Sequence, residues 1–334
     1  MRSLAAAAAA LVLAGTAHAQ PAPGKPMRVI VPYAAGGVTD AVTRAVVARV
    51  AESLGRPVIV ENRPGGGTVI GMQACAKGDP DGSTACVTVP DSLSYGPALM
   101  ASLPYDVERD FAPVLNLGFT NNLLVANAQA PFGNYREMIG HARASPGAIN
   151  IGTWGPATIP DVYARWIARQ ANVSLTSVHY KGSSGTIPAV LSGEVQVTFM
   201  GFGTALPHVR SGKLKPVVAL GEKRSAYLPT LGTLAEEGVD PGLVSYFGLF
   251  APGATPAPVV EWLNAEFSKA VRTQQVQEFY RSYTVDSALS TPDAFATFTR
   301  ADRRNAAKVF QSVGIVPGAC LLYTSDAADD TPCV

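Results

Sequence analysis

Residues 32–37, with the sequence PYAAGG, combine residue types that can bind an anion through the backbone. They lie between a β-rich run and an apolar, periodic helix. Gly36 and Gly37 let the chain turn so that successive amides point to one spot, and the N-terminus of the next helix adds partial positive charge. The same glycines also suit a tight strand-to-helix turn without a ligand, and the pattern alone leaves both interpretations open.

Two further loops have the same design. Residues 152–158 read GTWGPAT and residues 180–185 read YKGSSG, and each stands between a predicted strand and a predicted helix. Both offer amides and hydroxyl groups at the carboxyl end of a strand, where open α/β sheets bind their ligands. Three such loops, drawn from both halves of the chain, predict a cleft for a ligand with one or two carboxylates.

Catalytic patterns are weak in this sequence. No Gly-x-Ser-x-Gly segment occurs, because Ser183 and Ser184 follow Gly182 without that spacing. The glycine run 65–67 lacks the Lys-Ser/Thr of a phosphate loop, and we interpret it as a turn at the rim of the cleft. None of the four histidines has metal-ligand spacing to another, which favours buried, capping or solvated roles. We therefore expect no enzyme activity, no metal site and no cofactor.

Strand-like and helical runs alternate along most of the chain. Val42, Val46 and Val50 repeat every four residues, which predicts a helix over residues 39–54 with one buried stripe. Unalternating apolar strands separated by helices indicate an α/β fold with parallel-rich sheets. The central ~295 residues exceed the size of a usual single hydrophobic core and predict two domains.

The alternation restarts near residue 131, and two strand crossings, near residues 123–127 and 245–250, would join two lobes. We assign residues 26–125 and 246–318 to lobe 1 and residues 126–245 to lobe 2. We predict strands over residues 27–31, 58–60, 84–89, 149–152, 177–180, 195–199, 216–220 and 245–250. We predict further helices over residues 68–77, 135–144, 160–171, 186–191, 205–211, 256–271 and 291–310.

The first 19 residues have the pattern of a secretory signal peptide. Arg2 gives a minimal positive start, and residues 4–14 form an apolar run that is shorter than the roughly 20 residues needed to span a bilayer. Ala17, His18 and Ala19 form a small-x-small cleavage site, so the mature chain should begin at Gln20. No cysteine follows the site, and we expect no lipid anchor.

The C-terminal residues do not belong to the periodic pattern. Residues 320–330 read CLLYTSDAADD, which resembles the translation of a transposon adaptor used to prepare sequencing libraries. We interpret residues 320–334 as a non-native tail and exclude them from the fold. A natural disordered tail is the alternative.

The charge balance excludes one class of partner. The chain has 26 Lys and Arg against 25 Asp and Glu. Removing Arg2 with the leader and three Asp with the tail leaves 25 basic and 22 acidic residues, a net charge of +3. This weakly basic chain contains no Lys/Arg cluster, so we expect no nucleic-acid partner.

Two cysteines remain once the tail is set aside. Cys75 falls in a predicted helix and Cys86 in the next predicted strand. A secreted protein permits a disulfide between them. Two small buried thiols are the interpretation we favour, and the disulfide is the alternative.

A longer stretch carries a family resemblance. Residues 28–67, RVIVPYAAGGVTDAVTRAVVARVAESLGRPVIVENRPGGG, resemble the Bug family of periplasmic receptors, the substrate-binding subunits of tripartite tricarboxylate transporters. The resemblance extends over about residues 26–316. Further matches are AKGDPDGST, LPYDVERDFAPV, VHYKGSSGTIPAVLSGEVQVTF, LPHVRSGKLKPVVALGEKRSAYLP and YFGLFAPGATPAPVVEWLNAE.

The resemblance implies a two-lobed, type II-like periplasmic binding fold that closes on a small carboxylate. It also implies that the ligand passes to membrane transporter subunits, and we expect a monomer in the periplasm. In the family the first glycine loop grips a carboxylate through backbone amides and ordered waters. Together with Asp40 and Met200, the matching positions in the three loops give these candidate ligand-binding residues: Tyr33, Ala34, Gly36, Gly37, Asp40, Thr153, Trp154, Thr158, Ser183, Ser184 and Met200.

Several positions depart from the family pattern. Asp161 stands where relatives commonly have His, Gly96 where many have Asn, and Trp154 where a small polar residue is usual. Met200 and Gly201 replace a common Asp-Asn pair, which removes a partner for an ammonium group. The identity of the ligand therefore does not transfer from the family.

These departures lead to a hypothesis about the ligand. We expect a carboxylate without an amine, with an apolar or aromatic body that stacks on Trp154. If Trp154 instead packs between the lobes, it would shrink the cavity and favour a small aliphatic acid. A sensor that reports to a signalling partner, or an enzyme on the same fold, are the alternative functions.

Overall fold

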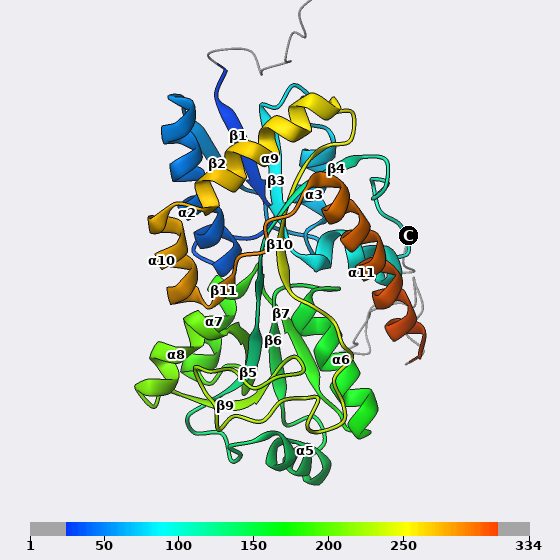
Figure 1. The fold of residues 1–334 in the computed structure, drawn as a ribbon. Helices are drawn as coiled ribbons and strands as arrows, with labels where there is room; N and C mark the ends of the chain where they lie inside the picture. The colour runs from blue at the N-terminus through cyan, green and yellow to red at the C-terminus, as the bar shows by residue number, and fades with distance from the viewer. Residues whose placement is uncertain (1–24, 313–334) are drawn as a thin grey trace, which may run out of the picture.

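The computed structural model describes residues 25–312, so the predicted leader and tail lie outside the described residues. Two α/β lobes lie one above the other, with the N- and C-terminal segments in the upper lobe and the green middle segment in the lower lobe (Figure 1). In the described part of the chain, no helix is both long and apolar enough to cross a bilayer.

The first lobe is built on a six-stranded sheet with the order β11-β4-β10-β3-β1-β2. β1 is parallel to β2 and β3, whereas β10 is antiparallel to both β3 and β4. The strands are β1 (Met27–Val31), β2 (Val58–Asn62), β3 (Thr84–Thr88), β4 (Phe111–Thr120), β10 (Tyr246–Pro252) and β11 (Val285–Asp286). The helices are α2 (Val38–Leu54), α3 (Val69–Ala76), η1 (Asp91–Tyr95), α4 (Gly96–Leu99), α9 (Ala257–Val271), α10 (Gln274–Tyr283) and α11 (Pro292–Ser312).

The second lobe repeats this design with five strands in the order β7-β6-β8-β5-β9. β6 is parallel to β7 and β8, and β5 is antiparallel to β8 and β9. The strands are β5 (Asn122–Asn127), β6 (Asn150–Thr153), β7 (Thr176–His179), β8 (Val197–Gly201) and β9 (Leu214–Ala219). The helices are α5 (Tyr135–Ala144), α6 (Ile159–Ala171), α7 (Ser183–Ser192) and α8 (Phe202–Arg210).

Two neighbouring segments connect the lobes. The chain leaves the first sheet at Thr120 and enters the second at Asn122, and it returns just before β10. The backbone N–H of Thr120 donates to the carbonyl of Ser245 at 3.0 Å, so the two segments are bonded to each other. The two-lobed α/β fold is confirmed. Both sheets are mixed, however, because the strands that follow the crossings enter antiparallel, and residues 122–125 pair in the second sheet.

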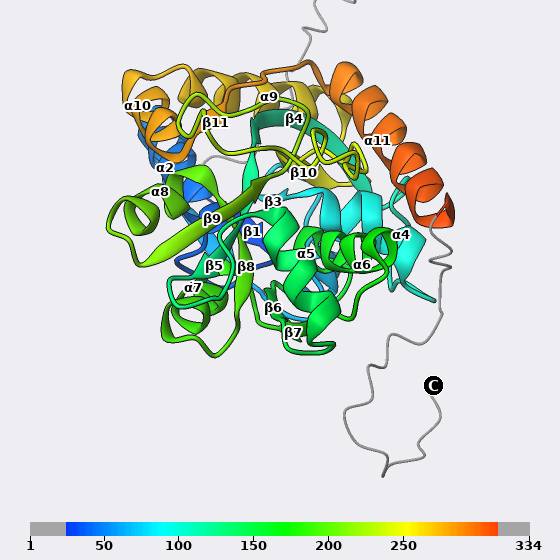
Figure 2. The same cartoon turned by 90° about the horizontal axis from the view of Figure 1, so that it is seen from below.

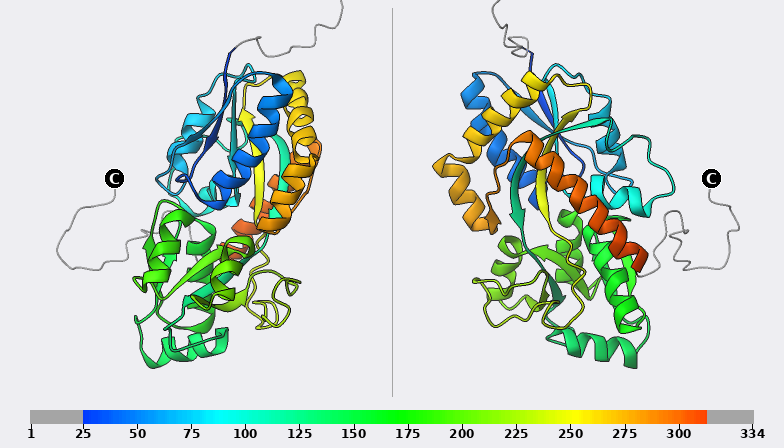
Figure 3. Two further views of the ribbon diagram at one scale, coloured as in Figure 1. Left: turned by 90° about the vertical axis from the view of Figure 1, so that its left-hand side faces the viewer. Right: turned by 45° about the vertical axis from the view of Figure 1, so that its right-hand side comes forward.

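Helices cover both faces of each sheet, and the central strands are buried on both sides. In the first lobe α2, α9 and α10 share one apolar cluster, while α3, η1 and α11 contribute to the cluster on the opposite face (Figure 3). In the second lobe α5 and α6 cover one face and α7 and α8 the other (Figure 2). Val42, Val46 and Val50 form the predicted buried stripe of α2.

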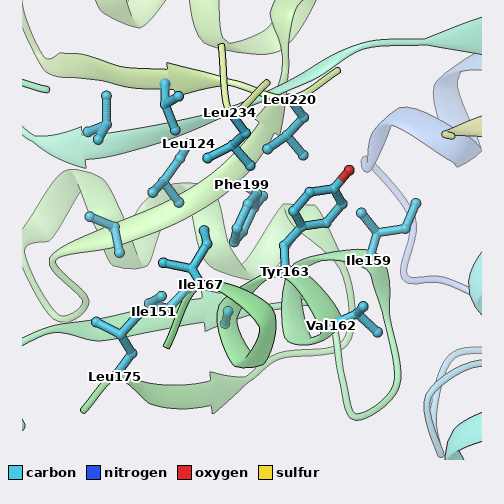
Figure 4. Close-up of a cluster of buried hydrophobic side chains, with 14 of the residues drawn as sticks. Leu124, Ile151, Ile159, Val162, Tyr163, Ile167, Leu175, Phe199, Leu220 and Leu234 are labelled. Carbon is cyan, nitrogen blue, oxygen red and sulfur yellow. The ribbon is translucent and has the colours of Figure 1, made fainter. Parts of the chain in front are cut away.

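The core of the second lobe extends to the first. Tyr163 and Phe199 pack beside Leu124 on one face of the sheet (Figure 4). Tyr95 and Phe310, from η1 and α11 of the first lobe, belong to the same cluster of buried side chains. The lobes are therefore in apolar contact as well as covalently joined.

The cysteine interpretation that we favoured is wrong. Cys75 on α3 and Cys86 on β3 form a disulfide, and both residues are fully buried. α3 packs over β3, which brings the two Cα atoms to 6.1 Å, within the range that a disulfide needs.

Candidate ligand-binding site between the lobes

A small cavity lies between the lobes, next to the crossing segments. Both lobes contribute to its wall, and none of the lining side chains carries a formal charge. The lining residues are Tyr33, Gly37, Val38, Thr39, Val89, Thr120, Asn122, Trp154, Ile159, Ser183, Gly201, Ser245 and Phe247.

Four helices begin at this cavity. α2, α6, α7 and α8 follow the N-cap residues Gly37, Thr158, Gly182 and Gly201, and none of these N-caps makes a side-chain capping bond. The first-turn amides of a helix have no partner within the helix, and the helix dipole places partial positive charge there. The first amides of α6 and α8 are already bonded, to Asp91 and to the carbonyl of Asn121. The helix starts of α2 and α7 therefore leave amide donors and positive potential near the cavity without a cationic side chain, which suits an anion.

Residues of the first glycine loop line the cavity, while the amides of others make bonds elsewhere. Gly37, Val38 and Thr39 line the cavity. The N–H of Gly36 donates to Asp40 at 2.9 Å, and the N–H of Ala34 donates to the carbonyl of Lys181 in the other lobe at 3.1 Å. Gly36 has a φ of +83°, so it supplies the turn, while Gly37 stands at the cavity itself.

Asp40 shapes this loop from behind the cavity wall. Its buried carboxylate accepts hydrogen bonds from Gly36, Arg44 and Asn62. Burial alone would raise the pKa of Asp40, but the bonds from Arg44, Gly36 and Asn62 lower it below the ordinary value. The carboxylate is thus held ionised, and it fixes the turn that precedes α2.

Tyr33 lines the cavity, and its hydroxyl is bonded to the protein. The hydroxyl donates to Oδ2 of Asp91 at 2.5 Å, and Oδ1 of Asp91 accepts from the N–H of Ile159 in the other lobe at 2.7 Å. Burial raises the pKa of Asp91 to about 7, although these hydrogen bonds oppose the rise. The sequence analysis did not identify Asp91. An acidic residue soon after a buried strand was the only feature of the sequence that could have indicated it.

In the second loop, Trp154 lines the cavity while its neighbours hold the loop. Oγ1 of Thr153 bonds Nδ1 of His179 at 2.6 Å, and Oγ1 of Thr158 donates to the carbonyl of Gly155 at 2.7 Å. Nε1 of Trp154 is buried and has no hydrogen-bond partner among the described residues. An unpaired buried donor costs about 1–3 kcal/mol, so a ligand that bonds Trp154 would recover that cost.

The third loop touches the first across the cleft. Ser183 lines the cavity, and its Oγ lies 2.9 Å from the position that a Cβ on Gly37 would occupy. The backbone nitrogen of Ser184 lies 4.0 Å from the same position. A Cβ on Gly67 in the first lobe would lie only 2.2 Å from the carbonyl oxygen of Pro156 in the second. The cleft is therefore closed.

Met200 lies outside the cavity wall. Its side chain is buried in the apolar cluster that α7 and α8 cover, beside Leu123 of the neighbouring strand. Gly201, the next residue, lines the cavity instead. Successive residues of a strand point to opposite faces of the sheet, so the side chain at position 200 points away from the cavity that Gly201 lines.

The crossing segments add polar groups that sequence reasoning missed. Thr120, Asn122 and Ser245 line the cavity, and Nδ2 of Asn122 donates to Oγ of Ser245 at 3.0 Å. Oγ1 of Thr120 is buried without a hydrogen-bond partner among the described residues. These groups form a polar wall at the crossing, to which Phe247 adds an apolar ring.

In the described part of the chain, no group of three or more His, Cys, Asp or Glu side chains could hold a metal ion. Two lobes joined by two crossings, with an uncharged cavity between helix N-termini, define a two-lobed solute-binding protein.

Residues 42–315 match the family described as tripartite tricarboxylate transporter family receptor, and the chain belongs to this family. It is 29% identical to Protein BugT of Bordetella pertussis over 304 residues, covering 90% of this chain and 93% of BugT. The predicted resemblance to the Bug family is confirmed.

Two solved structures with bound ligands are similar to this fold. MatC from Rhodopseudomonas palustris, with bound malate, is 29% identical with a TM-score of 0.80, and the match covers 86% of this chain and 99% of MatC. A second protein from R. palustris, with adipate, is 26% identical with a TM-score of 0.82. The match covers 88% of this chain and 99% of that protein. The chain is thus a solute-binding receptor.

Proposed function

We propose that this receptor captures a small carboxylate without an amino group and passes it to membrane transporter subunits. The proposal is supported by the convergence of four helix N-termini on a cavity with no charged side chain. The first amides of α6 and α8 are bonded to Asp91 and to the carbonyl of Asn121, so α2 and α7 supply the free amides. Free amides at such sites bind anions well. Malate and adipate, bound by two relatives, are carboxylates that lack an amine.

The exclusion of amino acids follows from the cavity wall. An ammonium group enclosed without water needs an anionic partner, and no Asp or Glu lines the cavity. Asp91 lies behind Tyr33 and Ile159, and both of its oxygens accept hydrogen bonds from the protein. Asp161 uses one oxygen to accept from the N–H of Ala157 and does not line the cavity.

The body of the ligand would meet apolar side chains. Val38, Val89, Ile159 and Phe247 line the cavity together with the indole of Trp154. These side chains favour an apolar or aromatic body, and Nε1 of Trp154 offers a donor to a polar substituent. A small aliphatic acid is the alternative, since the cleft is closed around limited space.

We also propose that the lobes close about the crossing segments at Asn121 and Ser245, and that the chain acts as a monomer without chemistry on its ligand. The leader 1–19 would direct it to the periplasm. The absence of a nucleophile beside an acid or base in the cavity wall supports the receptor role.

A thermal-shift screen with three matched pairs tests the ligand class. The pairs are succinate and aspartate, adipate and α-aminoadipate, and hydrocinnamate and phenylalanine. A ligand at a hundred times its dissociation constant adds about 2.7 kcal/mol to the free energy of unfolding. We expect at least one amine-free acid to stabilise the protein more than its α-amino partner. Stabilisation by the amino acids alone would overturn the proposal.

Trp154 variants test the body of the ligand separately. We expect hydrocinnamate to quench tryptophan fluorescence in the wild type, and its affinity to be kept in Trp154→Phe but reduced in Trp154→Ala. Equal affinity for the wild type and Trp154→Ala would remove the stacking contact and leave the carboxylate site standing.

A further inference from the structure

Asp91 joins the two lobes through a single carboxylate. It begins η1 of the first lobe and is fully buried. Oδ2 accepts from the hydroxyl of Tyr33 in its own lobe at 2.5 Å, and Oδ1 accepts from the N–H of Ile159 in the other lobe at 2.7 Å. Tyr33 and Ile159 both line the cavity, so this carboxylate connects two of its walls.

The bond to Ile159 supplies a helix cap from outside. Ile159 is the first residue of α6, and the N-cap residue Thr158 turns its own hydroxyl to the carbonyl of Gly155. A carboxyl group at a helix N-terminus stabilises the helix by accepting a hydrogen bond from a free amide, whether or not it is ionised. Because the capping carboxylate belongs to the other lobe, this stabilisation exists only while the lobes are together.

We propose that Asp91 is a clasp between the lobes, which holds the cleft closed through Tyr33 and Ile159 and makes closure depend on pH. The proposal rests on the proposed function in that closure accompanies ligand capture. Asp91 acts here as a positioning residue, since the hydroxyl of Tyr33 and the amide of Ile159 donate to its two oxygens.

Burial sets the direction of the pH dependence. It raises the pKa of Asp91 to about 7 in the closed cleft, from an ordinary value of 3.8. When the lobes separate, water reaches the carboxyl and its pKa falls towards the ordinary value. Closure therefore takes up a proton: it is most favoured at low pH, and it weakens as the pH rises towards 7.

The surrounding charges leave this direction unchanged. Asp161 on α6 adds to the rise in the pKa of Asp91, and its own ion pair with Arg165 partly offsets its charge. The titratable and charged groups on the elements packed around Asp91 are Tyr33, Tyr95, Tyr246, Asp161, Asp302 and Arg303. A protonated Asp91 keeps both contacts, since it can donate from Oδ2 to Tyr33 while Oδ1 still accepts from Ile159.

Two substitutions separate charge from contact. Asp91→Asn is neutral at every pH, and its amide can donate to Tyr33 while its oxygen accepts from Ile159. Asp91→Ala removes both contacts. Asp302→Asn is the matched control, because Asp302 is a buried carboxyl of the same lobe that accepts from Ser94 and has a pKa raised by burial to about 6.

Small-angle X-ray scattering of the mature protein without ligand, at about pH 5 and about pH 8, measures closure directly. For the wild type and Asp302→Asn we expect the ratio of closed to open molecules to fall by up to tenfold per pH unit between about 4 and 7. We expect Asp91→Asn to stay compact at both pH values and Asp91→Ala to be expanded at both. A pH response of Asp91→Asn equal to that of the wild type, or an Asp91→Ala variant as compact as Asp91→Asn, would overturn the clasp.

The same series with adipate separates this inference from the proposed function. If adipate compacts none of the proteins while the ligand-free series follows the expected pattern, the clasp stands and adipate is not the ligand. If adipate compacts the wild type but the pH response does not depend on Asp91, the carboxylate receptor stands and the clasp is refuted.

Discussion

Replacing Gly67 by Ala should prevent the lobes from closing without touching the cavity. A Cβ at this position would lie 2.2 Å from the carbonyl oxygen of Pro156 in the other lobe. Real Cβ atoms do not approach closer than 3.0 Å, so the lobes must separate here by about 0.8 Å. The oxygen belongs to the backbone and cannot rotate away. We expect ligand affinity to fall at least tenfold, about 1.4 kcal/mol, because the closed form becomes less populated.

Gly66→Ala is the matched control. Gly66 and Gly67 both have a φ of +58°, so an alanine at either position carries the same cost of about 1–2 kcal/mol for left-handed backbone. A Cβ on Gly66 would meet only Val69 and Ile70 of its own lobe, at 3.5 Å and 4.0 Å. Both variants should therefore unfold at similarly lowered urea concentrations, while Gly67→Ala alone loses affinity.

Calorimetric titration with the best carboxylate from the thermal screen, combined with scattering of the saturated proteins, measures the difference. The bound form of Gly67→Ala should have a larger radius of gyration than that of Gly66→Ala. Equal affinities and equal radii for the two variants would show that the contact between Gly67 and Pro156 does not limit closure.

Three further predictions concern individual side chains. Tyr33→Phe leaves an oxygen of buried Asp91 unpaired, so urea unfolding should show a loss of about 1–3 kcal/mol, and an unchanged free energy would contradict the bond. A reducing agent should lower the free energy of unfolding of the wild type by about 2–3 kcal/mol, because it breaks the disulfide between Cys75 and Cys86. The same agent should leave the free energy of unfolding unchanged in a variant with both cysteines replaced by Ser. Burial would raise the pKa of Asp40, but its hydrogen bonds lower it overall, so it stabilises the fold at neutral pH and less as the pH falls through that lowered pKa. Asp40→Asn should lose stability at neutral pH and show a flatter acid limb in urea titrations, and an unaltered acid limb would contradict this.

Periodicity was sufficient to predict most of the fold. The valines of α2 recur every four residues, and the parallel strands are short, continuous apolar runs. This spacing identifies each segment as a helix or a strand. β4 escaped prediction because Pro113, Asn116 and Gly118 interrupt its apolar pattern. The structure accommodates them through irregular pairing with β10, where the register shifts twice.

The loops of the site were predictable, but the atoms that face the cavity were not. Tyr33, Gly37, Trp154 and Ser183 line the cavity, whereas Met200 points into the core. A glycine loop between a strand and a helix indicates the edge of a sheet. The direction in which each side chain points, however, depends on strand register and on where the next helix begins. α7 and α8 each begin three residues before their predicted starts, which brings their N-termini to the cleft.

Contacts between residues that are far apart in the chain could not be predicted from any local sequence pattern. Asp91 and Ile159 are 68 positions apart in the chain, and their contact depends on how the two lobes meet. Thr120 and Ser245 meet because the chain crosses between the sheets twice at the same place. Neither pairing follows from the spacing of residues along one element.

A crystal structure of the protein with its tightest carboxylate from the thermal screen tests the central claim most directly. We expect the carboxylate oxygens to lie about 2.7–3.2 Å from backbone nitrogens at the start of α2 or α7, among them those of Gly37, Val38 and Ser183. We also expect no Lys or Arg side chain to bond the carboxylate. A carboxylate held by an ion pair, or a ligand bound outside the cavity between the lobes, would show that the helix N-termini are not the anion site.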